Sequence, residues 1–508
     1  MPTRHATISR REALQIAAGA TAIATTGALP SVSQARQTPV PLSIPDSGAS
    51  IPTEDVTFGY FNSGDYKGTF FRQYFEAYQQ KHPNISIDYQ GISGAESAKI
   101  IPLGIQNGNA PDCFQSIPGI SAAQMVQEGW IRPLDDIIPN FEEWKQNFPE
   151  TVLVEGVSVF DGKLYALPYV SSKQYATLLF YNTQYMEAAG YDPSSQPLSW
   201  DDFRTAAKKI TKAGQGQYYG FIVGGQQTGR WAQIINNLAE LAGGAGGTLD
   251  WRTGEYTYAS DEVLGAIELI LALNADGSIF PGSMSMNAPK ARGQFPMGTA
   301  GTIMQGTWNI PQWIVDAPDF NFQVASTPLA DPLQPAHISY GPGPSIPMFV
   351  NAESKYPEIA GDMFHYLGSE EGQRAFATIT NGSDRPMLDS AIESADLDER
   401  VRTAYDIFDE QLRVHPTPSV RNPDVEQVLL EQQRLSPDFG EIIQGLVAGQ
   451  LSDAKAAMQD LQGRANADLD RAIKAAQDKG ADVSREDWVF PNWDPPTDYT
   501  EEMYKELT

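Results

Sequence analysis

The chain has 508 residues, and its 35 Lys and Arg against 63 Asp and Glu give a formal net charge of −28. That length allows two or three domains, and a charge this negative argues against nucleic acid or an anionic membrane surface as a partner. The single cysteine, Cys113, excludes an intramolecular disulfide and a cysteine-based zinc cluster, and the five histidines are widely separated. We therefore expect no metal and no cofactor.

Residues 1–35 have the composition of an export signal. Three arginines precede a weakly apolar stretch, and Ser33-Gln34-Ala35 offers small residues at a plausible cleavage site. Ser9-Arg10-Arg11 resembles a twin-arginine signal, although Ala13 and Gln15 depart from its usual pattern. The alternative is a disordered tail with chance arginines. No cysteine follows the apolar stretch, so we expect an exported, extracytoplasmic protein with a cleaved signal and no lipid anchor.

Residues 36–54 are rich in Pro, Ser and Thr and are predicted to be a flexible linker. From about Asp55 onward, hydrophobic spacing alternates between strand and helix periods. The pattern predicts strands at 56–61, 85–89 and from Cys113, with helices at 70–78, 95–106 and 119–128. This order is typical of an α/β domain with a largely parallel sheet.

A second α/β region begins with the continuous apolar strand at 176–181. Ser199 is predicted to cap the next helix. Further helices are predicted at 231–241, 261–274, 357–367 and 369–379, with strands at 300–305 and 320–324. Beyond about residue 397 the chain is predicted to be mostly helical, with a tail rich in Trp, Pro and acidic residues.

Motifs for catalysis are weak in this sequence. Ser452-Asp453-Ala454-Lys455 matches an S-x-x-K pattern, but it opens an Ala-rich helix in which Ser is an ordinary cap, and its companion motifs are absent. The glycines at 224, 225 and 229 lack the spacing of a phosphate-binding loop. With 63 acidic residues a carboxylate pair could flank a glycosidic bond, but no spacing selects one.

Aromatic residues are the more informative class, with nine Trp and 21 Tyr. Trp308 follows a predicted strand, Trp231 begins a predicted helix, and Tyr60 and Asn62 end the first strand. Flat aromatic faces beside amide side chains suit a polyhydroxylated, uncharged ligand. Packing in the core is the alternative for each aromatic residue. Their place at strand ends, where open α/β sheets bind ligands, favours a binding role for the set.

Several short stretches, in a shared order over some 300 residues, resemble one family. They are GNAPD at 108–112, GWIRPLDD at 129–136, DGKLYALPY at 161–169, LFYN at 179–182 with Ala189-Gly190, PLSWDDF at 197–203, AGTIM at 300–304 with Gly306-Thr307-Trp308, and SEEGQ at 369–373 with Phe376. The chain resembles the extracellular solute-binding proteins of ABC importers, in the family that includes the maltose-binding proteins. The resemblance implies a two-lobed α/β fold of the periplasmic-binding-protein type (type II), which closes on its ligand by hinge bending.

The resemblance also implies discontinuous domains. The first lobe would comprise residues 55–168 and 322–383, and the second 169–321 and 384–508. The chain would cross between the lobes near 166–176, 316–326 and 380–388. The protein would then be a monomeric, non-catalytic receptor. It would bind a sugar or oligosaccharide between the lobes and deliver it to the permease subunits of the importer.

The candidate binding residues are Tyr60, Asn62, Ser116, Tyr175, Gln227, Trp231, Trp308, Tyr340, Asp384 and Arg385. Matching local motifs of the family implies the positions near Tyr60 to Asn62 and those of Ser116, Tyr175, Gln227 and Trp308. Ser116 stands where the maltose-binding proteins have an aromatic residue, so that stacking contact is in doubt. Tyr175 and Gln227 stand at positions of acidic residues, which suggests a different sugar or another polar solute. Two other functions remain open: an exported polysaccharide-active enzyme, and a binder that serves no importer.

Overall fold

The computed structural model describes residues 42–507 with the exception of 63–65, 93, 245 and 335–336. The predicted export signal, with its twin-arginine-like motif and cleavage site, lies outside the described residues. No helix in the part of the chain that is described has the length and apolar character needed to span a membrane.

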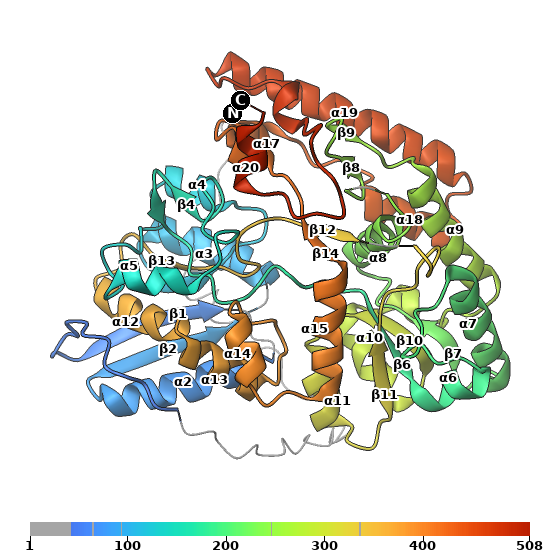
Figure 1. The fold of residues 1–508 in the computed structure, drawn as a ribbon, viewed down its shortest axis with the longest axis horizontal. Helices are drawn as coiled ribbons and strands as arrows, with labels where there is room; N and C mark the ends of the chain where they lie inside the picture. Colours follow the sequence, from blue (N-terminus) through green and yellow to red (C-terminus); the bar gives the residue numbers. More distant parts are fainter. Residues whose placement is uncertain (1–41, 63–65, 93, 245, 335–336, 508) are drawn as a thin grey trace, which may run out of the picture. The chain divides into compact units, whose positions relative to one another are not determined.

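The first sheet has four strands in the order β13-β3-β1-β2. Strand β1 (Val56–Asn62) pairs in parallel with β2 (Ile85–Gly91) and β3 (Cys113–Gln115), and β13 (Met348–Val350) is antiparallel to β3. Helix α2 (Gly68–Lys81) buries one face of Phe and Tyr side chains against this sheet. Figure 1 shows α2 in blue beside α12 (Pro357–Leu367) and α13 (Glu370–Thr380), which return from far along the chain.

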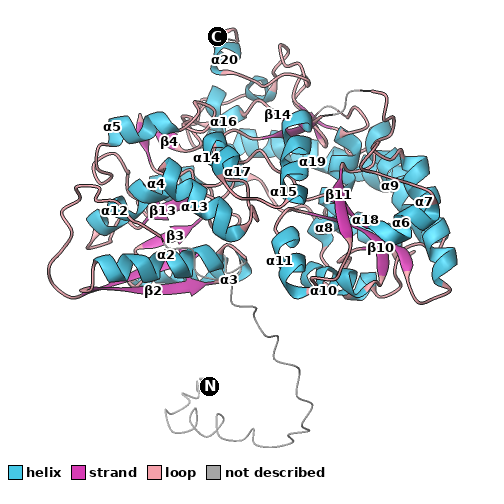
Figure 2. Cartoon of the chain, turned by 60° about the horizontal axis from the view of Figure 1, so that its bottom comes forward, coloured by secondary structure: helices cyan, strands magenta, loops and turns pink. Residues whose placement is uncertain are grey.

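The second sheet also has four strands, in the order β11-β6-β10-β7. Strand β10 (Ala300–Gln305) is parallel to β7 (Tyr219–Ile222) and antiparallel to β6 (Leu178–Asn182), and β11 (Phe322–Ala325) completes the other edge. Figure 2 shows helices along the strands of both sheets. The helices associated with this sheet include α6 (Thr183–Ala189), α7 (Trp200–Gly214), α8 (Thr228–Glu240), α9 (Asp261–Ala275), α10 (Ala288–Gln294), α11 (Asn309–Asp316) and α15 (Glu399–Gln411).

The connections between the sheets differ in part from the prediction. Strand β11 belongs to the second sheet, so the boundary predicted at residue 322 is wrong: the chain leaves that sheet after Ala325 and enters the first at Met348. The intervening segment contains β12 (Ile338–Tyr340), which pairs with β14 (Leu412–Val414). Because β11 pairs with the apolar strand β6, Phe322 and Val324 are buried in the core of the second sheet. Residues 316–326 therefore do not pass from one sheet to the other.

Three connecting segments lie side by side. Val170 bridges to Pro386, and Ser171 bridges to Pro344. The backbone N–H of Ser345 donates to Val170 O at 3.1 Å, and that of Ser171 donates to Arg385 O at 2.9 Å. The segments expected to cross between the lobes at 166–176 and 380–388 therefore lie beside one another. Residues 343–345 belong to the third connecting segment, in place of the one predicted at 316–326.

Residues 42–54 pack against the first core. For these residues the predicted flexible linker is wrong, and the folded part of the chain begins before Asp55. Leu42, Ile44 and Ile51 contact that core, and the Ser47 hydroxyl donates to Asp362 Oδ1 at 2.5 Å. The segment forms no helix or strand, and its composition is rich in Pro and Ser. Composition alone therefore predicts a linker, although the apolar residues of the segment are partly buried.

The C-terminal part is mainly helical, as predicted, with α17 (Val425–Glu431), α18 (Phe439–Val447) and the long α19 (Ala454–Asp478). The tail folds back: Phe490, Trp493 and Tyr499 form a separate buried cluster, and the Tyr499 N–H donates to Val414 O at 2.9 Å. The remaining short elements are α3 (Gly94–Asn107), α4 (Ala122–Gln127), α5 (Phe141–Trp144), β4 (Val159–Phe160), β5 (Lys163–Leu164), β8 (Leu249–Asp250), β9 (Glu255–Tyr256), α14 (Asp389–Ser394), α16 (Pro418–Arg421) and α20 (Glu501–Lys505).

Candidate functional site

The carboxyl ends of strands from both sheets contact one connecting segment, Ser383–Asp384. Lys67, which follows β1, places its Nζ 3.4 Å from Asp384 Oδ2, and both side chains are buried. Thr307, which follows β10, donates its hydroxyl to Ser383 O at 2.8 Å. Since the carboxyl edges of open α/β sheets are the usual ligand-binding edges, this junction is the candidate site.

At the first sheet, Asn62 ends β1 with its side chain almost completely buried. Its Oδ1 accepts a hydrogen bond from the Tyr89 hydroxyl at 2.8 Å, whereas its Nδ2 is buried and has no partner in the part of the chain that the structure describes. Ser116 follows β3 and lines, with Asn62, a cavity of about 10 Å³, room for about one water molecule. The structure thus brings two of the predicted residues to one edge.

Tyr60 precedes this edge and is completely buried, with its ring 4.8 Å from that of Phe75 in an edge-on arrangement. Its hydroxyl has no partner among the described parts of the chain, and neither has the buried hydroxyl of Tyr169. Burial raises the pKa of both phenols well above their ordinary value, and the charge of Asp384 adds to the effect at Tyr169. Both therefore remain neutral, with hydrogen-bonding capacity unused by the protein.

At the second sheet, Gln305 ends β10 with only 1% of its surface exposed, and its Nε2 is buried with no partner among the residues described. Trp308 is half-buried, and its indole Nε1 is also a buried donor that has no partner within the described ranges. The Trp308 ring lies over Gly306, where an added Cβ would be 2.3 Å from the ring atom Cζ3. Gly306 is therefore required for the ring to lie where it does.

Arg230, in the first turn of α8, contacts the same edge. Its Nη1 donates to Ala176 O at 2.8 Å and to Gln233 Oε1 at 2.9 Å, and its Nη2 lies 3.5 Å from Gln305 Oε1. Burial and the charge of Arg292 lower the pKa of Arg230 to about 10. The guanidinium thus remains charged at neutral pH in a place that disfavours its charge.

Three predicted residues use their side chains in contacts within the protein. Trp231 is completely buried, with its indole donating to Gly225 O at 3.0 Å, so it packs in the second core. Gln227 is exposed and accepts from the Ala288 N–H at 2.7 Å. Tyr175 is buried and donates to Gln411 Oε1 at 2.8 Å.

Arg385 lies in the connecting segment, and its charge is already compensated. Its Nη2 is 3.0 Å from both Asp389 Oδ1 and Asp409 Oδ1, and its guanidinium lies over the Tyr405 ring. Tyr340, in β12, is partly buried, and burial raises its pKa above the ordinary value. Arg385 thus joins the connecting segment to α14 and α15, and Tyr340 packs against the core of the second sheet.

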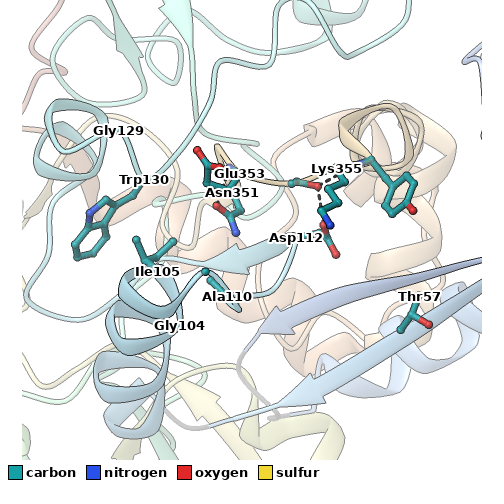
Figure 3. A pocket seen from close by; sticks show the side chains of 13 residues that line it. Thr57, Gly104, Ile105, Ala110, Asp112, Gly129, Trp130, Asn351, Glu353 and Lys355 are labelled. Atoms are coloured by element: carbon teal, nitrogen blue, oxygen red, sulfur yellow. Dashed lines mark hydrogen bonds between the residues drawn. The ribbon is translucent and has the colours of Figure 1, made fainter.

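A second hollow lies on the first lobe's sheet, near the start of β1. Its volume is about 340 Å³, and Figure 3 shows Trp130, Asp112, Asn351 and Lys355 around it. Asp112 accepts from the Gly59 N–H at 2.8 Å and from the Ser354 hydroxyl at 2.6 Å. Those bonds satisfy the carboxylate, so the hollow presents less unused bonding capacity than the strand-end junction.

The described residues contain no group of three or more His, Cys, Asp and Glu side chains that could hold a metal.

The family model for bacterial extracellular solute-binding proteins matches residues 63–374, more than half of the chain. The chain belongs to this family. As a solute-binding protein of an ABC transporter it is a binder rather than an enzyme, and the family is extracellular or periplasmic.

Sequence relatives of this solute-binding protein are distant. An uncharacterized ABC transporter extracellular-binding protein of Pyrococcus horikoshii is 23% identical over 63% of this chain and 68% of its own. An sn-glycerol-3-phosphate-binding periplasmic protein of Agrobacterium fabrum is also 23% identical, over 71% of this chain and 80% of its own.

Solved structures establish the fold. An ABC transporter solute-binding protein from Thermotoga lettingae, bound with α-D-tagatose, has a TM-score of 0.61 at 18% identity and covers 82% of this chain and 100% of its own. Maltose-bound MalE3 of T. maritima has a TM-score of 0.61 at 17% identity and covers 80% and 98%. The predicted two-lobed α/β class is therefore confirmed.

The residue-by-residue prediction did not include Lys67, Tyr169, Gln305 or Arg230. One signal was available for Gln305, because it is the polar residue that ends an otherwise apolar strand, the same signal that selected Asn62. The contact of Lys67 with Asp384 joins positions more than 300 residues apart in the chain, and no local pattern reveals it.

Proposed function

We propose that this solute-binding protein holds a sugar or oligosaccharide at the junction of the two strand-end edges and delivers it to the permease of an ABC importer. The observation that carries the proposal is the set of buried donors at this junction that have no partner among the described residues: Asn62 Nδ2, Gln305 Nε2 and Trp308 Nε1. Buried polar groups are nearly always hydrogen-bonded. A hydroxyl-rich solute would satisfy all three donors.

The compared proteins support a hydroxylated solute. Two structural neighbours hold tagatose and maltose, and several sequence relatives are named for binding sn-glycerol 3-phosphate. In this proposal Asn62 and Ser116 contact the solute from the first lobe, and Gln305 and the Trp308 ring contact it from the second. An aromatic face beside amide donors fits the C–H face and hydroxyl rim of a sugar.

The connecting segments at 166–176, 343–345 and 380–388 would act as the hinge. We propose that the mature protein begins near Arg36 after export, carries no acyl chain and acts as a monomer. Intact-mass measurement of the exported protein tests the cleavage site directly.

Small-angle scattering and tryptophan fluorescence, run with a panel of mono- and oligosaccharides, test the binding function. A ligand that binds should shift the fluorescence and reduce the radius of gyration, because both lobes then contact one solute. Hydrolysis assays on the same panel should show no turnover. Saturable binding with an unchanged scattering curve would contradict closure of the two lobes, and turnover would contradict the receptor function.

A further inference from the structure

We propose that the solute carries an anionic group, a carboxylate or a phosphate, which binds at Arg230 beside the end of β10. This inference rests on the proposed function. It specifies the solute further, as an anionic sugar or an anionic polyol. It depends on one feature of the second lobe: a positive charge held at the strand-end edge with no carboxylate partner among the described residues.

Arg230 differs in its partners from other arginines of the chain. Its guanidinium contacts only a backbone carbonyl and two side-chain amide oxygens among the described residues. By contrast, Arg385 contacts two carboxylates, and Arg204 on α7 contacts Asp276 at 2.7 Å. In a chain of net charge −28, an arginine without an acidic partner at a ligand-binding edge is consistent with selection for an external anion.

A second cation lies near the first. The positive charge of Arg292 contributes to lowering the pKa of Arg230. Two positive charges repel one another, and an anion bound at Arg230 would offset that repulsion. Arginine also binds carboxylate and phosphate in a two-pronged geometry that a lysine does not provide.

Two further features of this edge favour an anion. Gln305 contacts Arg230 through its Oε1, so its partnerless Nε2, bonded to the same carbon, lies beside the guanidinium and offers another donor. Arg230 also lies in the first turn of α8, a 13-residue helix whose first turn contains no acidic residue and whose cap, Gln227, forms no side-chain cap bond. The N-terminus of a helix attracts anions through its free N–H groups.

The remaining groups of the junction fit the rest of such a solute. The Trp308 ring and the amide of Asn62 suit a hydroxylated carbon chain or ring, whereas Lys67 already has a carboxylate partner in Asp384. The anionic group is therefore assigned to the second lobe and the hydroxyls to both.

Calorimetric titration with matched pairs of solutes tests the inference. The pairs are glucose with glucuronate and glucose 6-phosphate, and glycerol with sn-glycerol 3-phosphate; maltose and raffinose serve as larger neutral probes. We expect an anionic member to bind at least tenfold more tightly than its neutral parent, with affinity that falls as KCl rises. Whether carboxylate or phosphate is preferred distinguishes a sugar acid from a phosphate ester.

Variants separate a binding role of Arg230 from a structural one. Arg230→Gln should weaken the anionic solute about 10- to 100-fold, the loss of one or two charge-assisted hydrogen bonds, and should weaken the neutral parent far less. Arg292→Gln should weaken the same solute less. Arg204→Gln removes a distant arginine as the matched control and should have no effect.

The outcomes distinguish this inference from the proposed function. Tight binding of a neutral sugar, unaffected by Arg230→Gln, overturns the anionic class and leaves the receptor function intact. Equal loss of neutral and anionic binding in Arg230→Gln, with a lowered melting temperature, means that Arg230 only holds α8 to β10, which also overturns it. Binding of no probe of either class counts against the inference and the proposed function together.

Discussion

Glu240 gives the most quantitative prediction. This carboxyl, at the end of α8, is 5% exposed and receives hydrogen bonds from Asn236 Nδ2 at 3.3 Å and from the N–H and hydroxyl of Ser339 on β12. Burial raises its pKa from 4.5 to about 7, although the bonds from Ser339 oppose the shift. Because the folded protein holds the proton more tightly, the stabilisation is complete below pH 4.5 and is lost as pH rises through 7.

The difference between the two pKa values corresponds to roughly 3 kcal/mol of unfolding free energy. Urea unfolding at several pH values from 4 to 8 should therefore show a loss of about this size in the native chain that is missing in Glu240→Gln, whose amide keeps the shape. Glu268→Gln, an exposed substitution on α9, is the matched control and should behave like the native chain. Equal pH dependence of the native chain and Glu240→Gln would refute the reasoning.

Three further predictions concern the junction and the core. Trp308→Ala should weaken solute binding by about 2–4 kcal/mol in calorimetry, a hot-spot magnitude, with little loss of thermal stability. Trp231→Phe should instead lower the melting temperature and preserve affinity. The reverse pattern would show that Trp308 packs in the core. Lys67→Met should cost about 3–5 kcal/mol in urea unfolding because it leaves Asp384 buried and unpaired, and the double variant Lys67→Met/Asp384→Asn should lose less than the two single variants added together; strict additivity would show that the pair does not interact. The Cys113 thiol is buried and burial raises its pKa, so a thiol reagent should label it only at the rate of unfolding, and rapid labelling of the native chain would contradict its burial.

Much of the fold could be predicted because its elements have strong local signals. The predicted helix at 357–367 coincides with α12, the strand at 300–305 coincides with β10, and Ser199 caps α7 by accepting from the Asp202 N–H. The short helix α11 after Trp308 was missed because a proline lies in its first turns and its eight residues give little periodicity. The third connection was misplaced because pairing of β11 with β6 is a tertiary contact that an apolar run alone does not specify.

The site was only partly predictable, for a related reason. Asn62 was found because it ends the first strand, and Ser116 because the family resemblance implied a binding position there; both lie at the carboxyl edge of the first sheet. Trp231 was selected as an aromatic residue at a helix start, yet the same position lets its ring enter the core. Arg230, one residue earlier, points to the edge instead, and a change of one residue on a helix turns the side chain by about 100 degrees.

The position of a bound solute tests the central claim most directly. A crystal structure of the protein with whichever solute binds in the titrations should place it in contact with Asn62, Gln305 and the Trp308 ring, within hydrogen-bonding distance of the three donors that lack partners. A solute found instead in the hollow beside Trp130 and Asp112, with those donors still unsatisfied, would contradict the assignment of the site.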